Sequence, residues 1–412
     1  MIDYSEFKLD NGLQVIASTD SATPMVAMNI LYKVGAKDEQ PDKTGFAHLF
    51  EHLMFGGSEN IPSYDTPLQM AGGENNAFTN NDFTNYYLSI PQQNLDTAFW
   101  LESDRMLNLA FSEKSLEVQR NVVIEEFKQR YLNQPYGDFW LLMRPFVYTV
   151  HPYRWSTIGK DISHIAHATM NDVRSFYGKF YHPQNAILSV VGNITENYVR
   201  QLCDRWFAPI QKGEEMLRDN AKEPVQLERK NMHVERDVPF DMLCKAYHMC
   251  ARMDAEYYAC DMLSDILSNG NSSRLYNKLV KEKKLFGEMD AYISGDIDEG
   301  LFVFSGKLMK GVTMEQAEAG IDEEIEHIKT QTLPEAELSK IKNKIESAMI
   351  FGNESVLNRA LKLAVASMLG DSALANTEID NYLKVDSTEI KEVANKILID
   401  SNCSVLYYHA KK

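Results

Sequence analysis

The amino-acid sequence predicts an α+β protein made of two domains. A chain of 412 residues is too long for one ordinary hydrophobic core, so two large domains are expected. Stretches with the two-residue period of strands alternate with stretches of helical period in both halves. The second half repeats the order of the first, which indicates one architecture used twice.

The first half opens with strands and then changes to a helix. Residues 7–17 predict two short strands around an Asp-Asn-Gly turn, and residues 26–34 predict a third strand. The period becomes helical at residues 45–55, and Gly56 and Gly57 end this helix. Further strands are predicted at 76–79, 84–90 and 186–192, and further helices between 94 and 131, at 170–180 and up to about 207.

A charged and weakly periodic segment, residues 211–230, predicts the boundary between the domains. We therefore expect an N-terminal domain at 1–210, a linker at 211–230 and a homologous C-terminal domain at 231–412. Within the second domain, residues 240–249 predict a strand and residues 256–267 predict a helix.

The composition is that of a soluble globular protein, with 44% hydrophobic and 25% charged residues. No apolar run approaches the roughly 18 residues that span a bilayer, so no membrane segment is expected. The formal net charge of −17 argues against nucleic acid as a partner, because phosphate binding needs a concentrated positive surface.

The cysteines and the N-terminus bear on the compartment. The chain has five cysteines without CxxC spacing, which favours a reducing environment. The first residues show no basic region followed by an apolar stretch, so no secretory signal is expected in the sequence as it stands. A cytoplasmic location is therefore expected, or a periplasmic one if a signal peptide has been trimmed.

Two histidines mark the predicted helix at 45–55. His48 and His52 are four residues apart, so their side chains leave one face about one turn apart and can reach a single ion. Glu51 lies on nearly the same face, where it can take a proton from a zinc-bound water. In the second half, Asp261 and Asp265 stand where the histidines stand in the first. The chemistry is therefore expected in the N-terminal copy.

A catalytic zinc ion needs a third protein ligand and an open fourth position. The best candidate segment is the predicted helix at residues 116–127, whose apolar face is interrupted by acids. The pattern of this helix does not distinguish Glu125 from Glu126 as the ligand.

Short motifs follow one another in order along essentially the whole chain. They are Asn11-Gly12-Leu13, the run 45–55, Gly72-Gly73, Asn76-Ala77-Phe78-Thr79, the run 82–87, His151-Pro152-Tyr153, Phe180-Tyr181-His182-Pro183 and Val190-Val191-Gly192-Asn193. This ordered set resembles the pitrilysin or insulinase family of zinc metallopeptidases, the inverzincins, whose signature is HxxEH followed far downstream by a glutamate ligand. So many matches in order are highly specific.

The resemblance implies two homologous αβ-roll domains, each a mixed sheet backed by helices, facing each other across a cavity. It also implies a zinc endopeptidase in which His48, His52 and Glu126 hold Zn²⁺. Glu126 is the implied ligand because the family's glutamate lies six residues after an arginine, here Arg120. Gln119 departs from the family pattern, since an uncharged amide stands where a carboxylate that supports catalysis is usual.

The implied mechanism uses Glu51 to activate the zinc-bound water. Asn76, Ala77, Phe78 and Thr79 resemble the family's substrate-binding edge, where a peptide adds as an extra strand through backbone hydrogen bonds. Docking of this kind implies a broad sequence preference among unfolded peptides or small proteins.

Family members that cleave alone carry an arginine and a tyrosine seven residues apart in the second half. Lys281 and Glu288 stand at those positions here. The chain therefore resembles the zinc-bearing subunit of the shorter two-domain bacterial members, and we expect a homodimer, or a heterodimer with a family member that carries the Arg/Tyr pair. The alternatives are a self-sufficient homodimer that uses Lys281 or other residues, and a non-catalytic structural or peptide-binding subunit of a larger assembly.

Overall fold

The chain forms two compact units, each built around a β-sheet. The computed structural model describes residues 1–216, 218 and 221–411, so positions 217, 219 and 220 of the predicted linker, and position 412, lie outside the described residues. No helix in the described part is long and apolar enough to cross a membrane. The first unit comprises residues 1–133, 151–221 and 350–377, and the second comprises 134–150, 222–349 and 378–412.

These compact units differ from the contiguous halves expected from the sequence in two segments. Residues 134–150 belong to the second unit although they precede the predicted linker, and residues 350–377 belong to the first unit although they follow it. The main passage between the units, after residue 221, lies inside the predicted linker.

The sheet of the first unit is mixed, with the strand order β1-β2-β6-β3-β5-β4. β2 and β6 run parallel, whereas the other neighbouring pairs are antiparallel. The β1–β2 hairpin turns through Gly12, whose φ of 91° is strained for residues other than glycine. The strands are β1 (Ser5–Lys8), β2 (Gln14–Thr19), β3 (Met25–Tyr32), β4 (Glu74–Thr79), β5 (Thr84–Pro91) and β6 (Ala186–Gly192).

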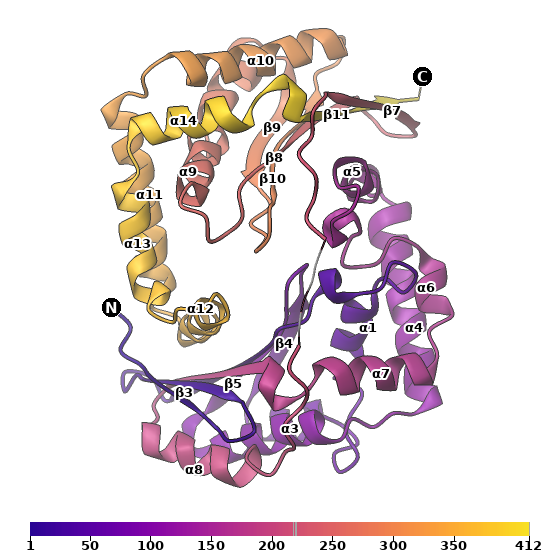
Figure 1. Cartoon of the computed structure of the whole chain (residues 1–412), viewed down its shortest axis with the longest axis vertical. Helices are drawn as coiled ribbons and strands as arrows, with labels where there is room; N and C mark the ends of the chain where they lie inside the picture. The colour runs from indigo at the N-terminus through magenta and orange to yellow at the C-terminus, as the bar shows by residue number, and fades with distance from the viewer. Residues whose placement is uncertain (217, 219–220, 412) are drawn as a thin grey trace. The chain divides into compact units, whose positions relative to one another are not determined.

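Helices cover both faces of this sheet (Figure 1). α12 packs against β3 and β6, where Leu31 and Ile187 meet Leu363 in one apolar cluster. α1, α3 and α8 pack on the strands from the other face. β6 is buried along its whole length, as expected for a strand covered on both faces. The helices are α1 (Phe46–Leu53), α2 (Asp65–Met70), α3 (Leu95–Leu107), α4 (Glu113–Phe127), α6 (Ile162–Ala166), α7 (Met170–Phe180), α8 (Glu196–Trp206) and α12 (Val356–Met368), and the π-helical turn η3 (Lys128–Leu132) continues α4.

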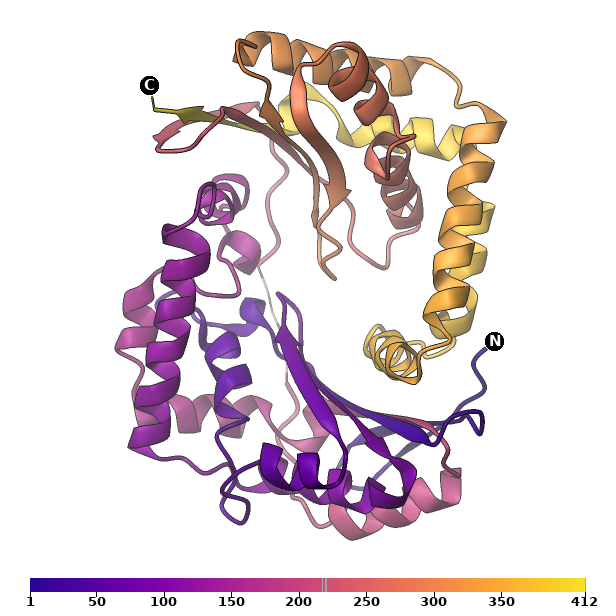
Figure 2. The same cartoon turned by 180° about the vertical axis from the view of Figure 1, so that it is seen from behind.

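The second unit repeats this topology with five strands, and among the described residues its sheet has no counterpart of β1. Its strand order is β7-β11-β8-β10-β9, and its parallel pair, β7 with β11, takes the place of β2 with β6. The other neighbouring strands are antiparallel, as in the first unit, and α9, α10 and α14 cover one face (Figures 1 and 2). The prediction of two mixed sheets backed by helices is therefore confirmed. The elements are α5 (Phe139–Val147), β7 (Lys230–Arg236), β8 (Met242–His248), α9 (Tyr257–Ser268), η6 (Tyr276–Glu282), β9 (Phe286–Ile293), β10 (Leu301–Leu308), α10 (Met314–Thr330), α11 (Glu335–Gly352), α13 (Leu374–Lys384), α14 (Ser387–Ile397) and β11 (Cys403–Ala410). The last residues of α11, from 350, and the first residues of α13, up to 377, fall in the first unit.

Candidate metal centre

The start of α1 is held by a buried carboxylate that the sequence analysis did not single out. Glu39 accepts hydrogen bonds from the backbone N–H groups of Gly45, at 2.9 Å, and Ala47, at 2.8 Å. Burial raises the pKa of Glu39 well above its usual range, and these two backbone donors oppose the rise. Gly45 has a φ of 88°, and a Cβ on it would come within 2.7 Å of the Ile158 carbonyl oxygen. The first turn of α1 is therefore held by the Glu39 hydrogen bonds and by the close packing of Gly45 against the Ile158 backbone.

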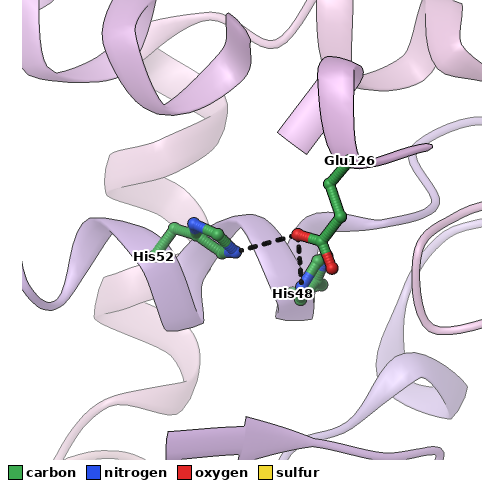
Figure 3. A group of neighbouring side chains, drawn as sticks. All are labelled: His48, His52 and Glu126. Atoms are coloured by element: carbon green, nitrogen blue, oxygen red, sulfur yellow. Dashed lines mark ion pairs between the residues drawn. The ribbon is translucent and has the colours of Figure 1, made fainter. Parts of the chain in front are cut away.

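Three side chains with metal-ligating atoms converge between α1 and α4 (Figure 3). His48 and His52 leave α1, and their Nε2 atoms lie 3.6 Å and 3.5 Å from Oε2 of Glu126 on α4. The two helices pack against each other, which brings a residue 74 positions away from His52 to the histidines. All three side chains are partly buried.

The three residues fit a zinc ion in both charge and spacing. Burial lowers the pKa of His48 to about 4, so its imidazole is neutral near pH 7 and its lone pair is available to a metal. The hydrogen bond with His52 lowers the pKa of Glu126, which favours the carboxylate. Ligands held about 2.0–2.2 Å from zinc in a tetrahedron lie roughly 3.3–3.5 Å apart. The nitrogen-to-oxygen distances are close to this spacing.

The neighbouring acid on α4, Glu125, does not join the group. Its side chain is exposed and pairs with Lys128 at 2.6 Å. Glu126, in contrast, also pairs through Oε1 with the guanidinium of Arg130 at 2.9 Å. The sequence analysis did not identify Arg130, although Arg130 lies four residues after Glu126 on a helix, which is a usual spacing for an ion pair.

Glu51 is hydrogen-bonded to the strand that was predicted to bind substrate. The Thr79 hydroxyl donates to Oε2 of Glu51 at 2.6 Å. Burial raises the pKa of Glu51, and the Thr79 hydrogen bond and the nearby His52 oppose the rise. Thr79 therefore uses its side chain to orient Glu51, a contact that the sequence analysis did not predict.

One cavity joins the candidate residues. It measures about 390 Å³, which falls in the usual range for ligand pockets. β4 is the last strand of its sheet and contributes one wall. Besides the predicted residues, Arg130, Tyr131, Thr157 and Ile158 line the cavity, and no sequence motif had marked them. The predicted residues on its wall are His48, Glu51, His52, Asn76, Ala77, Phe78, Thr79 and Glu126.

The two residues that stand in place of the Arg/Tyr pair lie in the second unit. Lys281 is in η6, with its ammonium 5.0 Å from the centre of the Tyr276 ring. Glu288 is in β9 and pairs with Lys307 at 2.8 Å. Each therefore has a partner within its own unit.

The fold and the residues together define a class: two-sheet α+β proteins that carry an HxxEH helix and a distant glutamate in the first unit. Models of a single peptidase family match both halves of the chain. "Insulinase (Peptidase family M16)" matches residues 14–135, and "Peptidase M16 inactive domain" matches residues 167–345. The chain belongs to this family, peptidase M16, which is the pitrilysin or insulinase family.

Individual relatives agree with this assignment. "Zinc protease PqqE" of Helicobacter pylori is 29% identical over 410 residues, which cover 98% of this chain and 92% of the relative. The crystal structure of a protease from Helicobacter pylori has a TM-score of 0.94 at 28% identity and covers 99% of this chain and 100% of that one. The periplasmic protease PqqL from Escherichia coli shares the fold, with a TM-score of 0.81 at 18% identity, but this chain matches 48% of its length.

Proposed function

We propose that this chain is a zinc-dependent endopeptidase that hydrolyses peptide bonds of unfolded peptides or small proteins. One observation carries the proposal: a zinc-type donor set, an adjacent carboxylate and an edge strand line the same cavity. The names of the relatives support it, since several are called zinc proteases. In the same proposal, residues 1–210 and 231–412 are homologous domains, of which the first carries the chemistry.

The metal ligands in this proposal are His48, His52 and Glu126. When bound there, zinc supplies Lewis acidity for the scissile carbonyl. Glu51 acts as the general base that takes a proton from the attacking water, and then as the acid that returns it to the leaving amine. Thr79 keeps the Glu51 carboxylate oriented through its hydroxyl. The Thr79 hydroxyl engages Oε2 of Glu51, and in this proposal Oε1 is the oxygen that meets the attacking water.

The substrate docks on β4. Only one edge of this strand is paired, with β5. An extended peptide can therefore add to the open edge through the backbone groups of residues 76–79. Recognition of this kind reads the backbone more than the side chains, so the proposal includes a broad sequence preference.

A second chain completes the catalytic apparatus in this proposal. Lys281 and Glu288 occupy the positions at which self-sufficient relatives carry an arginine and a tyrosine. The length of PqqL supports pairing, since this chain matches about half of it. The partner is a second copy of this chain or a family member that carries the Arg/Tyr pair. The alternative function, a structural or peptide-binding subunit without catalysis, is suggested by the "inactive domain" description of the family model that matches residues 167–345.

Metal content and cleavage of a quenched, unstructured peptide library test the proposal on the purified chain, with and without a chelator. Near-stoichiometric zinc with chelator-sensitive cleavage supports a peptidase that is active alone. Zinc without cleavage, followed by cleavage when a family member with the Arg/Tyr pair is added, supports the paired enzyme. The Glu51→Gln variant is the matched control, because it should retain zinc and lose hydrolysis. Absence of zinc would refute the proposal and favour the structural alternative.

A further inference from the structure

Two cysteines of the second unit lie beside each other, whereas the candidate metal centre belongs to the first unit. Cys250 follows the end of β8, and Cys260 lies in the first turn of α9. Their Sγ atoms are 3.9 Å apart. In the described part of the chain all five cysteines are free thiols. A disulfide bond has sulfur atoms about 2.05 Å apart, so this pair would need to close by about 1.9 Å.

The two thiols differ in how freely they can move. Cys260 is 1% exposed and belongs to the apolar core of the second unit, whereas Cys250 is partly exposed and packs against that core. In the segment between them, residues 253–255 are exposed, whereas Tyr257 and Ala259 of α9 are buried. The approach of the two sulfur atoms is therefore expected to come from Cys250 and the exposed residues after it rather than from α9.

Exposure and hydrogen bonding also give the two thiols different chemical roles. The contact with Cys260 lowers the pKa of Cys250, which favours its thiolate. The same contact and burial raise the pKa of Cys260, so this thiol keeps its proton. Cys250 is thus the nucleophile that reacts with an oxidant from solution. Cys260 is the buried resolving thiol next to it.

We propose that Cys250 and Cys260 form a reversible disulfide when the protein meets a peroxide. The Cys250 thiolate attacks one oxygen of hydrogen peroxide and becomes a sulfenic acid, and the departing hydroxide takes a proton to give water. The Cys260 sulfur then attacks the Cys250 sulfur, and the sulfenic hydroxyl leaves with the Cys260 proton as a second water. The two thiols are oxidised by two electrons, and the peroxide is reduced to two waters.

The bond closes a loop from residue 250 to residue 260. It joins the end of β8 to the start of α9 and so constrains the unfolded chain. Oxidation should therefore raise the Tm of the second unit by about 5 °C, and a dithiol reductant should reverse the rise. The metal centre lies in the other unit, so zinc content should not change.

Peptide mapping after peroxide treatment tests the proposal on the full chain. Free thiols are blocked with N-ethylmaleimide, and the protein is digested with trypsin without reduction. Cleavage after Lys245, Arg252 and Arg274 places the two cysteines on separate peptides, 246–252 and 253–274. We expect these two peptides to be linked, and the link to disappear after reduction. The wild-type chain suffices for this measurement, so it does not depend on a variant that folds.

Two variants separate the steps. Cys260→Ser should leave Cys250 as a sulfenic acid that dimedone labels. Cys203→Ser is the matched control, because it removes a buried thiol of the first unit. This control should leave the linked peptides and the Tm rise unchanged. Three results would overturn the proposal: peroxide treatment that yields no linked peptides, Cys250 oxidised to the sulfinic acid while Cys260 remains free, or a link to another cysteine.

Discussion

The α1–α4 region of the first unit and the α9–α11 region of the second unit share the same arrangement of elements along the chain. Each region lies beside a mixed sheet, and five strands of the two sheets share the same order and direction. The side chains differ: Asp261 and Asp265 take the places of the two histidines, and Ser264 takes the place of Glu51. The backbone plan alone therefore does not create the candidate metal centre.

The second region uses its acids for local hydrogen bonds. Asp261 accepts a hydrogen bond from the Tyr382 hydroxyl at 2.6 Å, and Asp265 accepts one from the Asn269 amide at 2.6 Å. Burial raises the pKa of both carboxyls, and Lys344 on α11 opposes the rise at Asp265. A lysine near these acids favours a self-contained polar cluster, whereas the glutamate near the histidines in the first unit favours a cation. The difference teaches that both the side chains on the first helix and the charge of the residue on the second helix distinguish the two regions.

The largest expected effect comes from removing a histidine in the first region. Removal of its counterpart in the second region is the control. His48→Ala should abolish stoichiometric zinc binding and lower kcat/KM by on the order of a thousandfold or more, because a catalytic zinc needs all three protein ligands. Asp261→Ala should leave zinc content and cleavage unchanged. Metal analysis and peptide cleavage on both variants check this. Zinc loss in the Asp261 variant would mean that the comparison of the two regions is wrong.

A smaller effect is expected from Thr79, which links β4 to Glu51. Thr79→Val keeps the shape of the side chain but removes the hydroxyl that donates to Glu51. Loss of a hydrogen bond to a charged group should lower kcat by about tenfold to a hundredfold. KM and zinc content should stay the same, since peptide docking uses backbone groups. Thr79→Ser restores the donor and should recover most of kcat. A change in KM alone would assign Thr79 to substrate binding instead.

The smallest expected effect lies in the polar cluster of the second unit. Tyr382→Phe removes the donor to Asp261 and should lower the free energy of unfolding by about 1–3 kcal/mol near pH 7, because a buried carboxylate loses its partner. The pKa of Asp261 is raised in the folded state, chiefly by burial. As the pH falls through that raised pKa, Asp261 gains a proton and the cost of the lost donor should shrink. Urea unfolding at neutral and acidic pH measures this. In the Asp261→Asn background the pH dependence should vanish, and its persistence would point to another group.

Several strands and helices could be predicted closely because their signals are local. The helix at 170–180 and the strand at 186–192 were found at the predicted residues, since capping and apolar runs fix both ends. The HxxEH helix was equally clear, because its spacing alone places both histidines on one face. Gly45 and Glu39 show what local signals do not predict. The start of α1 is capped by the Glu39 carboxylate, which a turn of the chain brings back to the helix.

The sequence by itself determined the repeated architecture, the HxxEH helix and the strand at 76–79, because periods of two and of 3.6 residues are properties of short segments. The edge position of that strand was implied by the family resemblance, and the order of the sheet shows it. The helix pattern left Glu125 and Glu126 open and the family resemblance implied Glu126, whose carboxylate the tertiary structure places beside the histidines. Only the tertiary structure decided that Thr79 contacts Glu51 and that Cys250 lies beside Cys260. It alone placed residues 134–150 in the second unit and residues 350–377 in the first. These features depend on how elements distant in the chain pack together, and no local pattern records which helix covers which sheet.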